Sequence, residues 1–260
     1  MQYKFGINYD FDRVIHPDFS TTVACRYSPV DVRKVADEML AEGLLPADCL
    51  FNYETKFGSI SNPTDLARCG ERAMYEIGRI GKDELKKIKA KLNTGLREAD
   101  LQKAIAEISL TSGAAELADW AKSVGAYQIL VSDGWDPMVK YWGKHLEFEY
   151  AEGQKPVFVG GIFTGKVEMV DKATISRNKF EEMGILLDRV VGIDDSFANV
   201  KMLDGFGLAI AFCPTNEHTE QFTKAGYLED IDSDRVIISE RDLRLAKDAI
   251  ERWMKRKAII

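Results

Sequence analysis

Two aspartates separated by a single residue, Asp10 and Asp12, are the side chains in this sequence that most directly suggest chemistry. They follow the segment from Phe5 to Tyr9, which predicts a short buried strand. Paired carboxylates just beyond a strand end can attack a phosphorus atom, transfer a proton or hold a divalent cation. An isolated pair of this kind can equally close a strand and solvate a loop, so other residues must decide between the two interpretations.

The composition is that of an ordinary globular protein. The 260 residues are 45% hydrophobic and 30% charged, which suits one large α/β domain or a core domain with an insertion. The net charge of −7 argues against nucleic acid as a partner, because a phosphate backbone favours a basic surface. The sequence shows no secretion signal pattern and no apolar run of membrane-spanning length, so we expect a cytoplasmic protein without a membrane partner.

The cysteines and histidines form no recognisable metal or redox motif. The four cysteines lie far apart in the sequence, and the three histidines are too dispersed to build a metal site. We therefore expect free thiols, which fits a reducing cytosol.

Between the first strand and about residue 112, the sequence has the periodicity of helices. Ser28 as N-cap and Pro29 in the first position predict the start of one helix. Further helical patterns cover residues 64–80, 82–92 and 98–108. The segment from Pro46 to Pro63 contains glycine, asparagine and proline, which predicts a loop or a short connector.

From about residue 112 onward, helical and strand patterns alternate. The predicted strands are 127–131, 189–193, 208–212 and 235–239, with a hairpin in 155–170, and the predicted helices are 114–124, 138–144, 172–184 and 242–257. This alternation predicts an α/β fold with a Rossmann-like parallel sheet covered by helices on both faces. We therefore expect a core domain of residues 1–15 and 112–260, with residues 16–111 inserted as a mainly helical cap domain.

Polar residues follow three of the predicted strands, at the edge where open parallel sheets bind their ligands. They are Asp10 and Asp12 after the first strand, Ser132 after the second, and Asp194 and Asp195 after the third. Because these strand ends lie at one edge, we expect the side chains to form one site.

The residue types predict that this site transfers phosphoryl groups. We expect Asp10 to be the nucleophile, and Asp12 to donate a proton to the leaving oxygen and later accept one from water. Asp195, together with Asp10 and the Asp12 carbonyl group, would supply oxygen ligands to Mg²⁺.

The phosphate itself would be held by a loop and a lysine. Ser132 and the backbone N–H groups that follow it, beginning with that of Asp133, would hold phosphate oxygens. Lys172, at the start of its predicted helix, would bring a positive charge to the phosphate and to Asp10.

The order of these motifs resembles that of the haloacid dehalogenase superfamily, and within it the phosphoserine-phosphatase-like phosphatases with a helical cap after the first motif. The segments that carry the resemblance are Asp10-Phe11-Asp12-Arg13-Val14, Leu130–Trp135, Lys172 and Gly184–Asp195. The resemblance implies that superfamily's fold. It also implies a Mg²⁺-dependent phosphomonoester hydrolase that acts on a small phosphorylated metabolite through an aspartyl-phosphate intermediate.

The sequence departs from the family pattern in two motifs. The fourth motif commonly reads G-D-x-x-x-D; here Asp195 keeps the first acid, but Asn199 replaces the second. Asn199 offers a carbonyl ligand or hydrogen bonds but no charge, so metal binding would be weaker unless Asp194 compensates. Asp194 and Asn199 are therefore the residues expected to support the metal. In the second motif Asp133 replaces a glycine, and its side chain would point away from the phosphate or face a cationic part of the substrate.

The predicted cap domain shows the poorest resemblance. In phosphoserine phosphatases a cap glutamate and an arginine recognise the amino acid, but no glutamate closely follows Asp12 here, where His16 stands instead. Arg68 and Arg72 lie on a predicted cap helix and would meet an anionic substrate or pair at the surface. His16, Arg68 and Arg72 are therefore the candidate substrate contacts in this region.

Three alternatives to a general phosphomonoester hydrolase stay open. The first is phosphoserine phosphatase proper. The second is a weakly active phosphate-ligand-binding protein on the same fold, which Asn199 and Asp133 motivate. The third is a metal-free dehalogenase whose aspartate attacks carbon, against which Asp12 and the acidic fourth motif argue.

Overall fold

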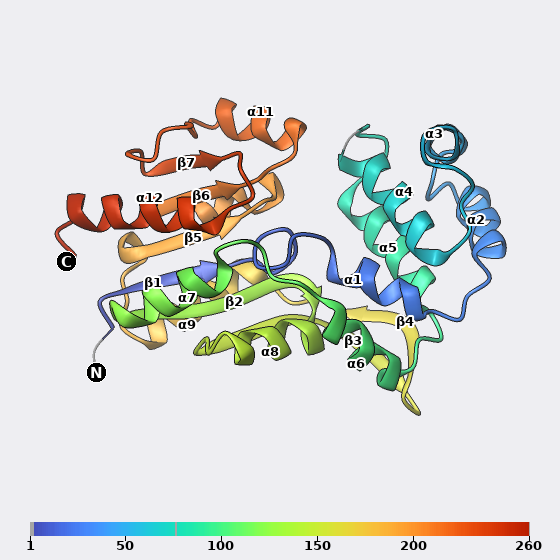
Figure 1. Cartoon of the computed structure of the whole chain (residues 1–260), viewed down its shortest axis with the longest axis horizontal. Coiled ribbons are helices and arrows are strands. Elements are labelled where there is room, and N and C mark those ends of the chain that lie inside the picture. Colours follow the sequence, from blue (N-terminus) through green and yellow to red (C-terminus); the bar gives the residue numbers. More distant parts are fainter. Residues whose placement is uncertain (1–2, 76, 260) are drawn as a thin grey trace. The chain divides into compact units, whose positions relative to one another are not determined.

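The structure is a computed structural model that describes residues 3–75 and 77–259. Its internal contacts divide the chain into two compact units. The core unit comprises Met1–Asp18, Ser109–Gln154 and Met169–Ile260, and the helical unit comprises Phe19–Ile108 and Lys155–Glu168. Figure 1 labels the helices and strands of both units.

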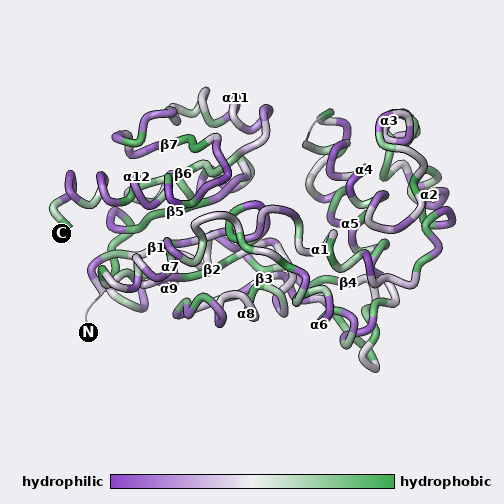
Figure 2. The backbone as a smooth tube through the Cα atoms, in the orientation of Figure 1, coloured by the Kyte–Doolittle hydropathy of each residue, from purple (hydrophilic) through white to green (hydrophobic). Residues whose placement is uncertain are grey.

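The core unit is built on the parallel strands of one sheet, whose edge strand β4 belongs to the helical unit. The strand order is β4-β3-β2-β1-β5-β6-β7, and every neighbouring pair except β3 with β4 is parallel. The strands are β1 (Phe5–Tyr9), β2 (Ala126–Trp135), β3 (Tyr150–Val159), β4 (Ile162–Glu168), β5 (Val190–Asp194), β6 (Leu208–Phe212) and β7 (Arg235–Ile238). β1, β5 and β6 are buried along their whole length, and Figure 2 shows the mostly hydrophobic character of β5 and β6. The predicted α/β fold is confirmed.

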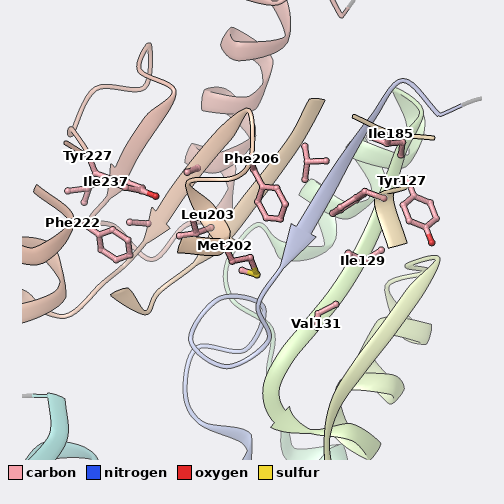
Figure 3. Packing of buried hydrophobic residues seen from close by; sticks show 14 residues of the cluster. Tyr127, Ile129, Val131, Ile185, Met202, Leu203, Phe206, Phe222, Tyr227 and Ile237 are labelled. Atoms are coloured by element: carbon pink, nitrogen blue, oxygen red, sulfur yellow. The ribbon is translucent and has the colours of Figure 1, made fainter. Parts of the chain in front are cut away.

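Helices of the core unit cover both faces of this sheet. They are α7 (Ala114–Ser123), α8 (Asp136–His145), α9 (Lys172–Glu182), α10 (Val200–Leu203), α11 (Asn216–Lys224) and α12 (Leu243–Arg256). On one face Phe180, Leu203 and Phe222, from α9, α10 and α11, belong to one buried cluster (Figure 3). On the other face the ring of Phe5 lies 6.3 Å from that of Trp253 in α12.

Helix α9 approaches β1 very closely at Gly6. A Cβ atom at this position would lie 2.3 Å from Cε1 of Phe180, so a side chain at Gly6 would displace the ring. Phe180 is completely buried, and burying such a side chain stabilises the fold by roughly 1.5–3 kcal/mol. The absence of a side chain at Gly6 therefore sets the distance between α9 and the sheet.

This packing predicts a stability effect that a double mutant isolates. Gly6→Ala should lower the free energy of unfolding by about 1–3 kcal/mol, because the added methyl group overpacks the Phe180 ring. Phe180→Leu should also destabilise, but the double mutant Gly6→Ala/Phe180→Leu should lose less than the sum of the two. Urea unfolding measures all three values, and strictly additive losses would contradict the proposed contact.

The helical unit contains six α-helices among its described residues. They are α1 (Ser20–Ala24), α2 (Val32–Ala41), α3 (Ala47–Phe57), α4 (Pro63–Tyr75), α5 (Lys82–Asn93) and α6 (Glu98–Glu107). Met39, Leu66 and Ile88, from α2, α4 and α5, are completely buried in its own hydrophobic cluster. Within the described part of either unit, no helix combines the length and hydropathy that crossing a membrane would need.

Two expectations for this unit are wrong. Helix α2 begins at Val32 because the Asp31 side chain caps it, accepting hydrogen bonds from the N–H groups of Arg33 and Lys34. Residues 46–63, expected to be a loop, contain α3, whose Cys49 and Tyr53 are buried one turn apart. The helix-breaking residues of this segment lie at both ends of α3, since Pro46 precedes it and Gly58 ends it.

The hairpin of β3 and β4 belongs partly to the helical unit. β3 pairs with β2 as far as Gln154 and continues into an antiparallel pair with β4, around a turn at Gly160 and Gly161. The N–H group of Phe163 in β4 donates to the Leu96 carbonyl (2.8 Å), and the Gly95 N–H donates to the Phe163 carbonyl (2.9 Å). The helical unit therefore differs from the expected cap domain of residues 16–111, because that expectation placed this hairpin in the core.

Candidate active site

Three carboxylates lie together at the carboxyl edge of the central strands. Asp10 directly follows β1, Asp194 ends β5, and Asp195 follows it. β1 and β5 are neighbours, and the Asp10 N–H donates to the Ile193 carbonyl (3.0 Å). One oxygen from each carboxylate lies within 4.8 Å of the other two, and all three residues are buried. The parallel pairing of the two strands thus brings together acids that are 184 residues apart in the chain (Asp10 and Asp194).

A buried lysine joins two of these acids. Lys172 Nζ lies 2.8 Å from Asp10 Oδ2 and 2.5 Å from Asp194 Oδ2, and its side chain is 6% exposed. Burial alone would lower the pKa of Lys172, but the charges of Asp10 and Asp194 outweigh burial and hold that pKa above its ordinary value. The two carboxylates therefore favour the charged form of Lys172.

Helix α9 and strand β1 place Lys172 opposite Asp10 by a matched spacing. Phe180 packs on Gly6, Ser176 Oγ donates to Asn8 Oδ1 (3.1 Å), and Lys172 pairs with Asp10. Steps of four residues keep the helix positions on one face, and steps of two keep the strand positions on one face. Both steps advance about 6 Å, so the three pairs stay in register.

The buried surroundings of Asp10 disfavour its ionised form, and Lys172 offsets part of this effect. Burial raises the pKa of Asp10, Lys172 counteracts that rise, and the nearby Asp194 and Asp195 add to it. Asp10 Oδ1 also accepts a hydrogen bond from the Phe11 N–H (2.7 Å). The ionised form that a nucleophile needs therefore depends on the positive charge of Lys172.

Asp194 is occupied by hydrogen-bond donors of the chain. Besides Lys172, the Ser196 N–H donates to its Oδ1 (2.9 Å), and Asn199 Nδ2 lies 3.1 Å from Oδ1 and 3.0 Å from Oδ2. The sequence predicted that Asn199 supports a metal. In the structure the Asn199 amide donates to Asp194, and Asp194 pairs with Lys172. Asn199 therefore helps to orient the carboxylate that holds Lys172.

Asp195 is paired with an arginine that sequence reasoning did not single out. Arg13 Nε lies 2.8 Å from Asp195 Oδ2, and Arg13 Nη2 donates to the Cys213 carbonyl (3.4 Å). Burial raises the pKa of Asp195 to about 6, although the Arg13 charge opposes that rise. The available signal was position, because Arg13 immediately follows the Asp-x-Asp pair, but a single basic residue beside two acids does not predict a contact 182 residues away.

The second predicted motif lies in an irregular part of β2. The strand was expected to end at residue 131, but it continues to Trp135, with a shift of register against β3 between Val131 and Trp135. Ser132 is buried, and its Oγ accepts a hydrogen bond from the Gly134 N–H (3.0 Å). Such irregularities often redirect side chains beside active sites. Ser132 follows the residues of β2 that pair with β1, at the same sheet edge as Asp10.

The added acid of this motif, Asp133, has a defined neighbour. Gln154 Nε2 donates to Asp133 Oδ1 (2.9 Å), and Gln154 Oε1 accepts from the Val170 N–H (2.7 Å). Asp133 is half-buried, and its negative charge helps to raise the pKa of Lys172. Its carboxylate is therefore oriented by the Gln154 amide within the core unit.

The remaining candidates lie in different surroundings. Asp12 is half-buried, and its backbone forms a single parallel β-bridge with the backbone of His16. His16 is buried, and its Nδ1 lies 2.9 Å from the Ser109 carbonyl oxygen, where the chain returns to the core unit. Arg68 and Arg72 belong to the helical unit; Arg68 is exposed, and the Arg72 guanidinium lies 4.6 Å from the centre of the Phe57 ring.

Comparison with known proteins places the chain in a family. The family model described as haloacid dehalogenase-like hydrolase matches residues 38–198. The chain therefore belongs to the haloacid dehalogenase-like hydrolases, as its motifs led us to expect.

Curated relatives with similar sequences are described as phosphoserine phosphatases. The chain is 33% identical over 179 residues to a probable phosphoserine phosphatase of Schizosaccharomyces pombe, a match that covers 65% of this chain and 57% of that protein. It is also 33% identical over 127 residues to a phosphoserine phosphatase of Streptomyces coelicolor, covering 46% of this chain and 31% of that protein. The matches thus span 57% and 31% of these two relatives.

Solved structures of phosphoserine phosphatases share the fold. A substrate-bound phosphoserine phosphatase complex has a TM-score of 0.68 at 21% identity, covering 95% of this chain and 99% of that one. A phospho-aspartyl intermediate analogue of phosphoserine phosphatase has a TM-score of 0.67 at 22% identity, with the same coverage of both chains. At this level of identity the likeness establishes the fold.

The contacts of Asp194 predict that a negative charge at position 199 destabilises the fold. Asn199→Asp should lower the free energy of unfolding by about 2 kcal/mol, because it replaces the amide donor of a buried carboxylate by a second acid. The loss should shrink as the pH is lowered, since protonating one carboxyl group of the pair restores a donor. Chemical unfolding at several pH values measures both effects.

The matched control is Asn216→Asp, which makes the same chemical change at an exposed position on the first turn of α11. It should leave stability within about 0.5 kcal/mol of the parent. If Asn199→Asp were as stable as this control at neutral pH, the Asn199 amide would not be holding Asp194.

Proposed function

We propose that the chain is a Mg²⁺-dependent phosphomonoester hydrolase that acts on a small phosphorylated metabolite through an aspartyl-phosphate intermediate. Asp10 is the proposed nucleophile and Asp12 the proposed acid and base. Family membership, the acidic cluster and the phosphoserine phosphatase relatives all support a phosphatase.

The observation that carries this proposal is the position of Lys172 between Asp10 and Asp194, next to Asp195. Lys172 favours the ionised form of Asp10 against the effect of burial and orients the carboxylate, as a nucleophile requires. A purely structural ion pair would not need a third buried acid within 4.8 Å, since extra charge at such a place costs stability.

The reaction would proceed in two displacements. An oxygen of Asp10 attacks the phosphorus, the bond to the substrate oxygen breaks, and Asp12 gives its proton to that leaving oxygen. Asp12, now ionised, then takes a proton from water as the water oxygen attacks the phosphorus of the aspartyl-phosphate. The acyl-phosphate bond breaks, inorganic phosphate leaves, and Asp10 and Asp12 return to their initial protonation states.

The phosphoryl oxygens would be bound by groups at the same sheet edge. Ser132 and the backbone N–H groups after it, including that of Asp133, would donate hydrogen bonds, and Lys172 would supply positive charge. Because Lys172 contacts Asp10, its positive charge would serve both the proposed nucleophile and the incoming phosphate.

The residues of the cluster suit a magnesium ion. Buried carboxylate oxygens are the hard donors that Mg²⁺ prefers, and Asp10 and Asp195, with the Asp12 carbonyl group, are the proposed ligands. When bound, the ion would reduce the repulsion between a carboxylate and a phosphate dianion. Asp194 is the third acid of the cluster, but it accepts from three donors of the chain, so we assign it to Lys172.

We assign the helical unit the role of a cap that selects the substrate, with its Arg68 and Arg72, and His16 of the core unit, as candidate contacts. The chain leaves the core unit six residues after Asp12 and returns at Ser109, and such an insertion beside the first motif can exclude bulk water from a site. The proposed location is the cytoplasm, which the four free cysteines support.

Phosphoserine is the second candidate substrate, because the relatives are described as phosphoserine phosphatases. The alternative of a weakly active or inactive ligand-binding protein rested on Asn199 and Asp133. Asn199 contacts Asp194 and Asp133 contacts Gln154, and Asp10 and Lys172 are paired beside them, so these two residues support that alternative less than the sequence suggested. Asp12 and the acidic fourth motif continue to argue against a dehalogenase.

A hydrolysis assay tests the proposal. The parent chain should release phosphate from p-nitrophenyl phosphate, EDTA should abolish the activity, and Mg²⁺ should restore it. Asp10→Asn should lower kcat by at least about a thousandfold, because the amide is a poor nucleophile.

The control is Asp119→Asn, which removes the same charge from an exposed position on α7 of the same unit and should retain full activity. A parent chain that turns over no phosphomonoester in a broad panel, with Mg²⁺ or Mn²⁺, would refute the proposed function. Extending the panel to phosphoserine, other phosphorylated amino acids, sugar phosphates and polyol phosphates would identify the substrate class.

A further inference from the structure

The guanidinium group of Arg13 contacts an acid that the proposed chemistry assigns to the metal. Arg13 Nε and Asp195 Oδ2 are 2.8 Å apart, and the two side chains are only 18% and 6% exposed. The attraction between these charges is screened less by water than that of a surface pair. The contact thus differs from the exposed ion pairs elsewhere in the chain.

The backbone of Arg13 has an unusual conformation. Its φ is +65°, which is uncommon for a residue other than glycine, and its N–H donates to the Asp18 carbonyl (3.2 Å). Its Nη2 also donates to the carbonyl of Cys213, just after β6. The side chain therefore links the loop after β1 with the ends of β5 and β6.

With Arg13 included, each acid of the cluster has a cation supplied by the chain. Lys172 pairs with Asp10 and Asp194, and Arg13 pairs with Asp195. Lys172 is needed beside the nucleophile, but nothing in the proposed two-step chemistry calls for a positive charge on Asp195. A fixed cation on a metal ligand competes with the metal for the same oxygen and also repels the metal.

We propose that Arg13 sets the divalent-cation affinity of the site by sharing Asp195 with the ion. This inference rests on the divalent cation of the proposed function. Arg13 weakens binding, so that the site fills only at the higher free concentrations typical of magnesium and does not retain scarcer, tighter-binding divalent metals. Arg13 is a residue that acts through Asp195 and takes no part in bond making or breaking.

The test is direct binding of Mn²⁺ to the purified full-length chain, followed by the electron paramagnetic resonance signal of free Mn²⁺ and by calorimetry. Arg13→Met should bind Mn²⁺ at least about tenfold more tightly than the parent, because the competing charge is gone. Arg13→Lys keeps the charge and should stay within about threefold of the parent. Arg13→Gln provides a second neutral variant should Arg13→Met fail to fold.

The matched control is Arg177→Met, which removes one positive charge from an exposed position on α9 of the same unit and should leave the affinity unchanged. Equal or weaker Mn²⁺ binding by both neutral Arg13 variants, with binding by the parent, would overturn the role of Arg13 and leave the proposed function standing. Absence of Mn²⁺ and Mg²⁺ binding by the parent and by every variant would overturn the metal site itself, and this inference with it.

Discussion

The buried contact of Lys172 with Asp10 and Asp194 is the interaction on which the rest of the site depends. Three charged groups with almost no exposure to water are stable only if they are paired and hydrogen-bonded. The chain meets this condition with one ammonium group between two carboxylates, and it adds the Asn199 amide to Asp194. Removing any partner would leave an uncompensated charge in the interior, so the geometry of the site and the stability of its surroundings are coupled.

The core packing places these charges. Gly6 lets the Phe180 ring approach the sheet, Ser176 bonds to Asn8, and the same helix face then ends at Lys172. Each step along the strand is matched by one turn of the helix, so an apolar contact at one end fixes an ionic contact at the other. The fold of the core unit thus positions the site, and substitutions at Phe180, two turns away from Lys172, should shift the position of the Lys172 side chain.

Much of the core could be predicted from the sequence because it is encoded locally. β6 was predicted at its observed bounds, since a run of apolar residues buried on both faces is recognisable without its neighbours. Lys172 was correctly predicted to begin a helix. By contrast, α3 was missed because the breakers at its two ends obscured the pattern between them, and α11 was not predicted. The contacts of Arg13 and Asn199, and the pairing of Phe163 with Leu96, depend on residues that only the folded chain brings together.

The most direct test of this account is to trap the covalent intermediate. The chain is mixed with p-nitrophenyl phosphate and Mg²⁺, quenched in acid within the first turnovers, digested and analysed by mass spectrometry. We expect one phosphate on the peptide that contains Asp10. It should accumulate further in Asp12→Asn, because deprotonation of the attacking water is slowed, and it should be absent in Asp10→Asn. Phosphate release by the parent without any phosphopeptide in the parent or in Asp12→Asn, or with the phosphate on another residue, would contradict the assignment of Asp10 as nucleophile.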